Sequence, residues 1–371
     1  MLLFILMKKF FNKIKNLYKF LVQIFFKRIY GKIIYASHHK NTNNLVIKKV
    51  CSQTIKKKEN FYQVYLIKKG RICTDYVENV SIIDNNKIVD NASYQQIKGE
   101  LKNARFNSAI KRGTPYFKKK FNGNILCLTQ GASGHSNYFH WLFDILPKIK
   151  IFSKIYNLDQ IEYFYLSKLK DFQKTTLKLL KCDKIKIIES NRYRHVSANK
   201  IFAVDHPWYS QGYILNEAKN LPMWIINWLR NSFLTAACKF DNNEKIFIDR
   251  TESQFNHCQL QNNNEVSSFL KSRGFTTYKV GQLTFEQQIY LFKKAKLIVG
   301  PHGAAFANLT FCSPGTKIVE IKPLTHPNFV SKTICRANDL DIKYIETPHI
   351  RNKKNLKGDI NLNLNELKKY I

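Results

Sequence analysis

The stretch that decides the fold is residues 244–346, and its centre reads LIVGPHGAAFANLT from Leu297 to Thr310. A short apolar run is followed there by a tight glycine loop and then by a segment that begins like a helix. The same succession of a strand and a helix recurs at short spacing on both sides. Alternation of this kind predicts a parallel sheet with helices on both faces, and so an α/β fold.

Local signals place the elements of this stretch. Gly274 stands where a left-handed helix cap needs glycine, and Thr284 with Gln287 has the spacing of a capping box. We expect strands at Lys245–Ile248, Phe275–Val280, Leu297–Val299, Lys317–Lys322 and Ile342–Glu346, and helices at Asn264–Ser272, Thr284–Lys296, Asn328–Asn338 and from Ala304 to Thr310.

A similar alternation extends upstream to about residue 121, whereas residues 45–120 give only short β-rich runs at Phe61–Lys68 and Val80–Ile83. A chain of 371 residues is long enough for two domains. We divide it into residues 1–40, 41–240, 241–346 and 347–371, the last being a polar tail or a helix crossing back to the first domain. Within 121–240 we expect strands at Asn124–Thr129, Ile161–Leu166, Lys184–Ile188 and Lys200–Val204, and helices at Asn137–Ile151, Phe172–Leu180 and Leu215–Ala237.

The formal net charge is +35. Such a charge fits nucleic acid, an anionic membrane or a phosphorylated small substrate. Lys is spread along the whole chain and is abundant together with Asn and Ile, which a biased coding composition would also produce. The eight cysteines include no CxxC pair and no zinc-finger spacing, so we expect free thiols in a reducing compartment.

Residues 1–35 combine a basic and an apolar pattern. Phe10, Ile14, Leu17, Leu21 and Phe25 recur at helical spacing between lysines. No apolar run approaches the roughly 20 residues that span a bilayer. The segment is typical of a basic amphipathic helix that lies flat on an anionic membrane, which predicts a cytoplasmic protein on the inner face of the membrane. The alternative is a helix docked on the protein's own core.

Two polar segments follow predicted strands of the second domain, where ligands bind to open parallel sheets. The loop from Gly300 to Gly303 has small residues and opens a helix, so its backbone N–H groups favour a phosphate, and His302 can donate to a phosphate or a ribose. Arg250, directly after a strand, can hold a diphosphate with two donors. The alternatives are a plain tight turn and an exposed arginine paired with a nearby acid.

The third polar segment lies in the first domain. Asn137, His140 and Asp144 are spaced i, i+3 and i+7, so they share one face of the predicted helix. A histidine or carboxylate placed there can remove the proton from an acceptor hydroxyl. The alternative is a hydrogen-bond network between domains that only positions the helix.

Together these segments resemble glycosyltransferase family 61, which includes capsular polysaccharide enzymes and eukaryotic xylosyl-, arabinosyl- and N-acetylglucosaminyl-transferases. The resemblance spans about residues 120–325. It is carried by Asn137-x-x-His140-Trp141-x-x-Asp144, Ile248-Asp249-Arg250, Gly300-Pro301-His302-Gly303-Ala304-x-x-x-Asn308, Ser313-Pro314-Gly315-Thr316 and Val319-Glu320-Ile321.

The resemblance implies a GT-B-like fold, with two Rossmann-like domains facing a central cleft, and an inverting transfer from a nucleotide sugar to a glycan acceptor. Residues 41–240 would hold the acceptor and residues 241–346 the donor. Asp144 would be the base, with His140 as the alternative. Donor-binding residues would be Arg250, His302, Gly303, Ala304, Asn308, Glu320 and Lys322, with Glu320 on the ribose, and acceptor-side residues would be His135, Asn137 and Trp141.

The product would be a surface polysaccharide of the capsular or lipopolysaccharide type, built by hexosyl or pentosyl transfer. We expect no cofactor and no metal, because arginine, lysine and helix amides can neutralise the leaving diphosphate. One alternative is a non-catalytic nucleotide-sugar or glycan-binding relative. A nucleic-acid-binding protein is disfavoured because no RNP motif, zinc spacing or helix-turn-helix is recognisable. A Rossmann dehydrogenase lacks its G-x-G-x-x-G.

Overall fold

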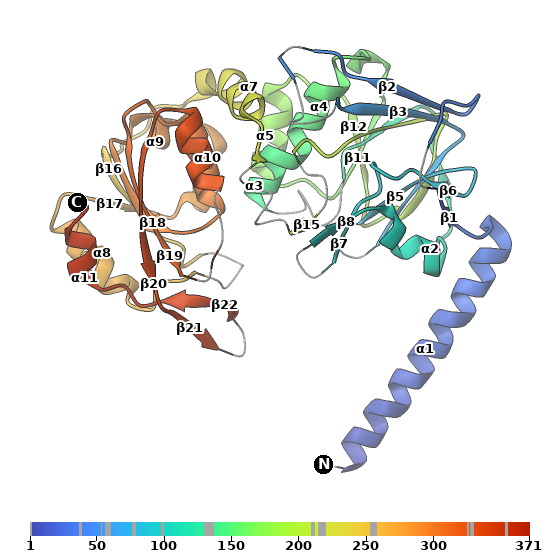
Figure 1. The fold of residues 1–371 in the computed structure, drawn as a ribbon, viewed down its shortest axis with the longest axis horizontal. Helices are drawn as coiled ribbons and strands as arrows, with labels where there is room; N and C mark the ends of the chain where they lie inside the picture. The colour runs from blue at the N-terminus through green and yellow to red at the C-terminus, as the bar shows by residue number, and fades with distance from the viewer. Residues whose placement is uncertain are drawn as a thin grey trace.

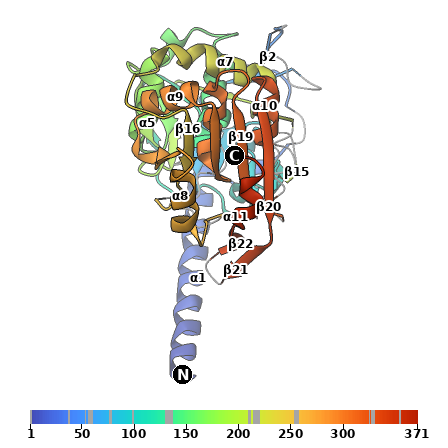
Figure 2. The same cartoon turned by 90° about the vertical axis from the view of Figure 1, so that its left-hand side faces the viewer.

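The protein is a mixed α/β molecule whose two halves lie side by side, with one long helix, α1 (Leu2–Tyr30), projecting from the first half (Figures 1 and 2). The computed structural model describes residues 2–36, 39–52, 54–55, 61–75, 79–97, 100–129, 137–208, 212–213, 220–252, 258–324, 326, 330–352 and 355–371.

The second half is built on a parallel sheet in the order β17-β16-β18-β19-β20. Numbered along the chain this order is 2-1-3-4-5, so the direction of winding reverses between β16 and β18. That reversal is the point at which open α/β sheets bind ligands. The strands are β16 (Lys245–Ile248), β17 (Thr276–Tyr278), β18 (Leu297–Pro301), β19 (Lys317–Pro323) and β20 (Asp341–Thr347).

Helices cover both faces of this sheet, as predicted. Successive side chains of a strand point to opposite faces: Ile318 packs with α9 (Phe285–Lys294) and α10 (Val330–Ala337), whereas its neighbour Val319 packs with α8 (Asn263–Lys271). Gly274 has a φ of 81°, and Thr284 and Gln287 form the capping box. The predicted helix after Gly303 is a 3-10 helix, η7 (Ala304–Phe311).

Residues 347–371 differ from the prediction of a polar tail or a crossing helix. They form a hairpin of β21 (His349–Asn352) and β22 (Asn355–Ile360), followed by α11 (Leu364–Lys368). Ile360, Leu362 and Leu367 are buried against the α8 face of the sheet. Apolar residues spaced among the lysines and asparagines thus bind this segment to the second half rather than the first.

The first half contains a mixed sheet in the order β12-β11-β10-β14-β3-β2. Strands β12, β11, β10 and β14 run parallel to one another, β3 is antiparallel to β14, and β2 is antiparallel to β3. The strands are β2 (Leu45–Lys49), β3 (Gln63–Lys68), β10 (Asn124–Cys127), β11 (Tyr163–Leu166), β12 (Lys186–Glu189) and β14 (Lys200–Val204).

A second sheet, not a layer of helices, covers one face of that mixed sheet. Its order is β1-β6-β5-β4-β13-β9, and its Ile72 and Ile82 share a buried cluster with Ile125 and Ile201 of the mixed sheet. The first half therefore departs from the predicted Rossmann-like pattern of helices on both faces. The strands are β1 (Ile34–Tyr35), β4 (Arg71–Thr74), β5 (Val80–Asp84), β6 (Lys87–Ile88), β9 (Lys119–Lys120) and β13 (His195–Ser197). The smaller elements are β7 (Gln95–Ile97), β8 (Glu100–Lys102), β15 (Gly212–Tyr213) and α2 (Ser108–Arg112).

The other face of the mixed sheet is covered by helices. The predicted helix Asn137–Ile151 is present as α3 (Tyr138–His140), a π-helical turn at Trp141–Ile145, and α4 (Leu146–Phe152). The helix predicted at Leu215–Ala237 is α7 (Met223–Phe233), which begins after Pro222 because proline suits a helix start. Its predicted first residues, 215–219, lie outside the described residues. Helix α5 spans Asp171–Leu179.

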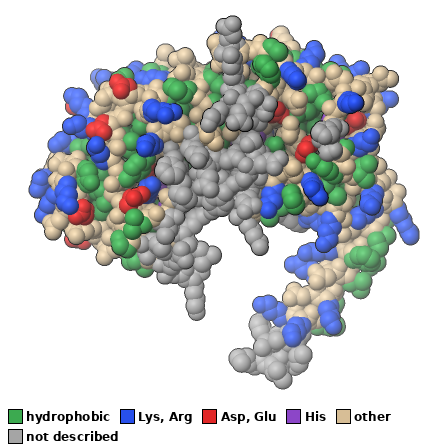
Figure 3. All heavy atoms as spheres, viewed as in Figure 1, with side chains coloured by type: hydrophobic (Ala, Val, Ile, Leu, Met, Phe, Trp, Pro, Cys, Tyr) green, Lys and Arg blue, Asp and Glu red, His purple; other side chains and the backbone are tan. Residues whose placement is uncertain are grey.

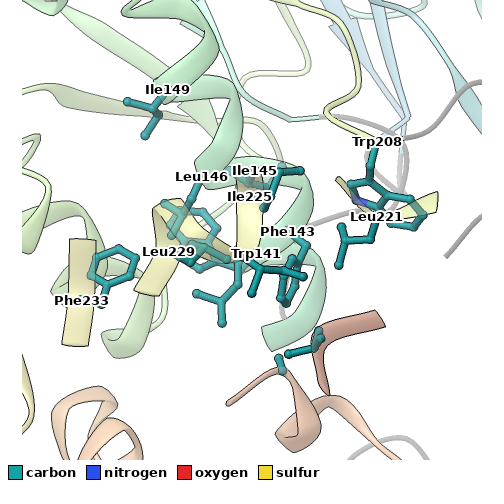
Figure 4. Packing of buried hydrophobic residues seen from close by; sticks show 14 of the residues in the cluster. Trp141, Phe143, Ile145, Leu146, Ile149, Trp208, Leu221, Ile225, Leu229 and Phe233 are labelled. Atoms are coloured by element: carbon teal, nitrogen blue, oxygen red, sulfur yellow. The ribbon is translucent and has the colours of Figure 1, made fainter. Parts of the chain in front are cut away.

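The two halves share one hydrophobic cluster (Figure 4). Trp141, Leu146, Leu229 and Phe233 of the first half belong to the same buried group as Phe285 of the second. The ring centroids of Phe233 and Phe285 are 5.2 Å apart. We conclude that hydrophobic burial, the main favourable contribution to folding, joins the halves instead of ending at their boundary.

We predict that Phe285→Ala lowers the free energy of unfolding by about 3–5 kcal/mol, because a fully buried aromatic side chain is lost and a cavity remains. Phe285 is 1% exposed and contacts the rings of Tyr138, Phe233 and Phe311. Denaturant unfolding followed by tryptophan fluorescence and circular dichroism should give one coincident transition for both halves. Phe106→Ala, at a 55% exposed position, is the control and should change stability by less than about 0.5 kcal/mol.

Candidate active site

The first polar cluster lies on the helical segment that starts at Asn137. The Asn137 side chain caps α3 by accepting a hydrogen bond from the backbone N–H of His140 at 3.2 Å. One turn later the backbone N–H of Leu146 bonds the carbonyl of Trp141, which widens the helix into a π turn. His140 Nδ1 and Asp144 Oδ2 are 2.7 Å apart. Facing a carboxylate, Nδ1 carries the proton, so Nε2 is the ring atom left for a substrate.

The carboxylate of Asp144 is buried, at 2% exposure, and already has several partners. Trp208 Nε1 donates to its Oδ1 at 2.8 Å, and His206 Nε2 lies 3.6 Å from its Oδ2. Burial by itself would raise the pKa of Asp144, but the charges and hydrogen bonds of His140 and His206 outweigh it and hold that pKa below its usual value. A carboxylate of this kind orients a histidine well and accepts a substrate proton poorly.

Lys148 lies on α4, one turn after Asp144. It is 2% exposed, and its Nζ donates to the carbonyl of Leu128 at 3.0 Å. Burial lowers the pKa of the Lys148 ammonium to about 8, while nearby Cys127, Asp144 and Asp205 act in the opposite direction. Lys148 thus places a positive charge close enough to the buried carboxylates of Asp144 and Asp205 to interact with both.

The second polar cluster lies where the winding of the parallel sheet reverses. Arg250 follows β16 and is 9% exposed, and its Nη1 donates to the carbonyl of His302, which follows β18. The side chain of Arg250 therefore connects the carboxyl ends of these two paired strands. Burial lowers the pKa of the guanidinium, which remains charged at neutral pH.

Gly303 is required by the close approach of Arg250. A Cβ at this position would lie 2.6 Å from Arg250 Cζ and 2.7 Å from its Nε. The backbone there is extended, with a φ of 173°, so the constraint is space and not an unusual conformation. Gly303 and Ala304 are both half-exposed at the start of η7. The loop therefore leaves backbone N–H groups and the arginine close to one accessible place.

His302 forms a second histidine–carboxylate pair. Its Nδ1 bonds Glu320 Oε1, and its ring centroid is 4.3 Å from that of His326. Glu320 is the fourth of seven residues in β19 and is 1% exposed. It therefore does not end a strand at an open crevice, as predicted for a ribose contact, but supports His302. Lys322 is likewise buried and pairs with Glu346 at 3.1 Å over the ring of Tyr344.

Asn308 and Trp141 have structural partners. Asn308 is fully buried, accepts a hydrogen bond from Tyr138 Oη at 2.6 Å and donates to Gln288 Oε1 at 3.0 Å. Trp141 is 1% exposed and donates from Nε1 to Thr176 at 2.8 Å. Asn308 thus links the two halves, and Trp141 belongs to the core. These positions do not fit the predicted direct contacts with donor and acceptor.

The two clusters are neighbours, because α3 packs directly against η7 through the Tyr138–Asn308 bond. His140 thus stands beside the element that Gly303 opens. Sequence reasoning missed His206 and Trp208, although both follow β14 at the same edge of the sheet as His140. Their position after a predicted strand was the available signal. The predicted acceptor-side residue His135 lies outside the described residues.

Among the residues that the structure describes, no group of three or more His, Cys, Asp or Glu side chains is arranged to hold a metal ion. The eight cysteines are all free thiols.

Comparison with known families decides the identity of the chain. Residues 138–319 match the family model described as Glycosyltransferase 61, from the helix carrying His140 to the strand carrying Glu320. The chain belongs to glycosyltransferase family 61. As predicted from its motifs, this family 61 member is a glycosyltransferase.

No protein with a curated description matches this sequence. One similar solved structure is that of a dodecameric iron-containing heptosyltransferase, TibC, in complex with ADP-D-β-D-heptose. It is 13% identical, with 76% of this chain and 80% of that chain covered and a TM-score of 0.29. A likeness this weak carries no argument about donor, metal or assembly.

We predict that the stability of the wild-type protein rises by up to about 3 kcal/mol between pH 8 and 10.5 relative to Lys148→Met. The folded protein releases the Lys148 proton near pH 8, whereas the unfolded chain keeps it to about pH 10.5. Stability increases with pH wherever the unfolded chain binds more protons. Urea unfolding of both proteins at several pH values measures the difference. Parallel pH profiles for the two proteins would contradict the buried charge.

Proposed function

We propose that this glycosyltransferase transfers a sugar, with inversion, from a nucleotide-sugar donor to a glycan acceptor. The observation that carries the proposal is the placement of two clusters on adjoining elements: a histidine–carboxylate pair, His140–Asp144, and an anion-binding corner, Arg250 with Gly303. We further propose a GT-B-like arrangement in which the second half holds the donor and the first half the acceptor. The parallel sheet of the second half, with its site at the winding reversal, supports that assignment.

The donor's diphosphate would lie at the corner where β16 and β18 end. The guanidinium of Arg250 is a suitable donor to phosphate oxygens, and it is held in place by the carbonyl of His302. The first N–H groups of η7 after Gly303 add partial positive charge. Glu320 fixes His302 through Nδ1, so Nε2 is the atom that would contact the donor. Glu320, Lys322 and Asn308 support this corner from within the protein.

We propose His140 as the base and Asp144 as the residue that positions it. The low pKa of Asp144 and its three polar neighbours favour this assignment of roles over one in which Asp144 is the base. When His140 accepts a proton at Nε2, the adjacent carboxylate stabilises the imidazolium that forms. The side chain of His140 is 21% exposed and that of Asp144 only 3%, so an acceptor reaches the histidine first.

The reaction would be a single displacement. A hydroxyl oxygen of the acceptor sugar attacks the anomeric carbon of the donor while its proton passes to His140 Nε2. The bond from that carbon to the diphosphate oxygen breaks, and its electron pair leaves with the nucleoside diphosphate. Arg250 and the start of η7 stabilise the charge that develops on the leaving group.

This chemistry needs no metal ion in our proposal, since Arg250 and backbone N–H groups supply the positive charge. We propose hexosyl or pentosyl transfer in the synthesis of a capsular or lipopolysaccharide-type surface polysaccharide. We also propose that the enzyme works in the cytoplasm at the inner face of the membrane, where nucleotide sugars and membrane-bound acceptors meet.

We predict that one nucleoside diphosphate in a panel raises the melting temperature by about 3 °C or more at a ligand concentration of about 100 Kd, in the presence of EDTA. Arg250→Ala should abolish the shift because the diphosphate loses its main side-chain contact. Gly303→Ala should weaken it, since the new methyl group displaces the guanidinium. Differential scanning fluorimetry measures all three proteins.

Arg273→Ala, an exposed arginine on the same half, is the matched control and should keep the shift. A shift that appears only with added divalent cation would disprove the metal-free proposal. A shift that survives in Arg250→Ala would place the nucleotide elsewhere.

With the donor class known, we predict that His140→Ala lowers kcat by about 10²–10⁴-fold, the usual contribution of a positioned base. Nucleotide stabilisation should persist in this variant, because the donor is held by the other half. Asp144→Asn should also be slow, since an amide cannot fix the histidine tautomer in the same way. Trp208→Phe, which removes one hydrogen bond to Asp144, should have a smaller effect. Full activity of His140→Ala beside an inactive Asp144→Asn would make Asp144 the base instead.

A further inference from the structure

Helix α1 presents a continuous apolar face to solvent. The members of this apolar face are exposed by 48–68%: Met7, Phe10, Phe11, Ile14, Leu17, Tyr18 and Leu21. They recur every three or four residues, so they form one stripe along the helix. Both ribbon views show α1 standing away from the body of the protein, and the space-filling view shows apolar side chains among lysines on it (Figures 1, 2 and 3). Ten of the large exposed apolar side chains of the described residues belong to α1, which makes it the main apolar surface.

The rest of α1 is rich in basic residues. Five lysines between Lys8 and Lys19 flank the apolar face, and Lys27 and Arg28 follow in the last turn. The first acidic residue of the whole chain is Glu59. Long lysine side chains on both edges of an apolar stripe can keep their ammonium groups in the headgroup layer while the stripe enters the apolar boundary.

The end of α1 is fixed to the first half by direct contacts. Phe26 is 7% exposed and its ring centroid lies 5.0 Å from that of Phe117. Tyr30 packs edge-on against His195 at 4.8 Å, and its carbonyl accepts a hydrogen bond from Arg71 at 3.0 Å. Lys27 Nζ donates to the carbonyl of Lys111 at 2.8 Å. The last turns of α1 therefore pack on the half that carries His140, and the exposed turns extend from that contact.

We propose that the apolar face of α1 docks on an anionic lipid bilayer, with the helix lying along the surface. No helix among the described residues is long and apolar enough to cross a membrane. The 29 residues of α1 have a length of about 43 Å, enough for the stripe to lie in the interface over several turns. This inference rests on α1 alone and not on the proposed transfer reaction. Docking of α1 would hold the enzyme, and so that reaction, at the membrane surface.

A second copy of the chain is a weaker occupant of this face. Two α1 helices packed together would bring seven positive charges each to one place, with no acidic side chain on either helix to pair with them. Anionic headgroups supply the missing negative charge, and their attraction increases with each lysine near the surface.

Co-sedimentation of the full-length protein with vesicles tests the proposal. We expect binding to phosphatidylcholine vesicles containing phosphatidylglycerol to be at least tenfold tighter than to phosphatidylcholine alone, and weakened by high salt. Phe10→Gln, Leu17→Gln and Leu21→Gln together should lower that binding at least tenfold. The matched control on the polar face is Asn12→Gln, Asn16→Gln and Gln23→Asn, which should bind like the wild type. Replacing Lys8, Lys9, Lys13, Lys15 and Lys19 by Gln should remove the preference for anionic vesicles.

Because the substituted side chains are exposed, except for the half-buried Gln23, whose change to Asn is conservative, the melting temperature and the nucleotide-dependent shift should be unchanged in every variant, which separates this test from that of the proposed function. Removal of residues 1–35 is a poor test, since it also deletes β1 and the fully buried Ile33. Wild-type protein that stays in the supernatant with anionic vesicles would overturn the proposal. So would a wild-type dimer in analytical ultracentrifugation that the apolar-face variant converts to monomer while vesicle binding persists.

Discussion

The segment from Asn137 to Phe152 is the constraint on which the rest of the structure depends. Its buried side, including Trp141 and Leu146, lies in the hydrophobic cluster shared by both halves, while its other side carries His140 and Asp144. Close-packed protein interiors have low compressibility and transmit strain from one side chain to the next. The same burial that holds the halves together therefore sets the position of the histidine relative to the start of η7, and Tyr138 adds a direct bond to Asn308.

A shared core also limits how the enzyme can move. Opening the halves as rigid bodies would expose Phe233 and Phe285 and break the hydrogen bonds from Arg230 to the carbonyls of Thr310 and Cys312. Each fully buried aromatic side chain contributes about 1.5–3 kcal/mol through burial. We therefore expect substrate entry to depend on smaller movements near the site rather than on a wide hinge between halves.

Sequence reasoning succeeded where local chemistry decides the outcome. The strands and helices from Lys245 to Thr347, the capping box at Thr284 and the paired positions of Arg250 and His302 follow from apolar runs, caps and strand ends. It failed where tertiary partners decide. Asn308 and Trp141 have the residue types of a site, but their partners Gln288 and Thr176 lie far away in the sequence.

The first half was the least predictable region for a related reason. Its second sheet consists of strands of two to five residues separated by asparagines and lysines. The alternation of apolar and polar residues is therefore too short to identify the buried face of each strand. The π turn could not be predicted from the sequence either, because its apolar residues have the same spacing as those of an α-helix. That turn still leaves the side chains of His140 and Asp144 next to each other. They lie on the helix face that the sequence predicted for Asn137, His140 and Asp144.

Each half thus offers a histidine whose Nδ1 bonds a buried carboxylate, and exposure assigns them different tasks. The His140 side chain is 21% exposed and that of His302 only 9%. In the reaction that we propose, an acceptor arriving from solvent would reach His140, whereas the more buried His302, which is held by Arg250, would contact a donor already bound. The carboxylates differ accordingly. Asp144 is surrounded by two histidines and Trp208, which suits a fixed orienting group, while Glu320 Oε2 has no hydrogen-bond partner among the described residues and can still accept one.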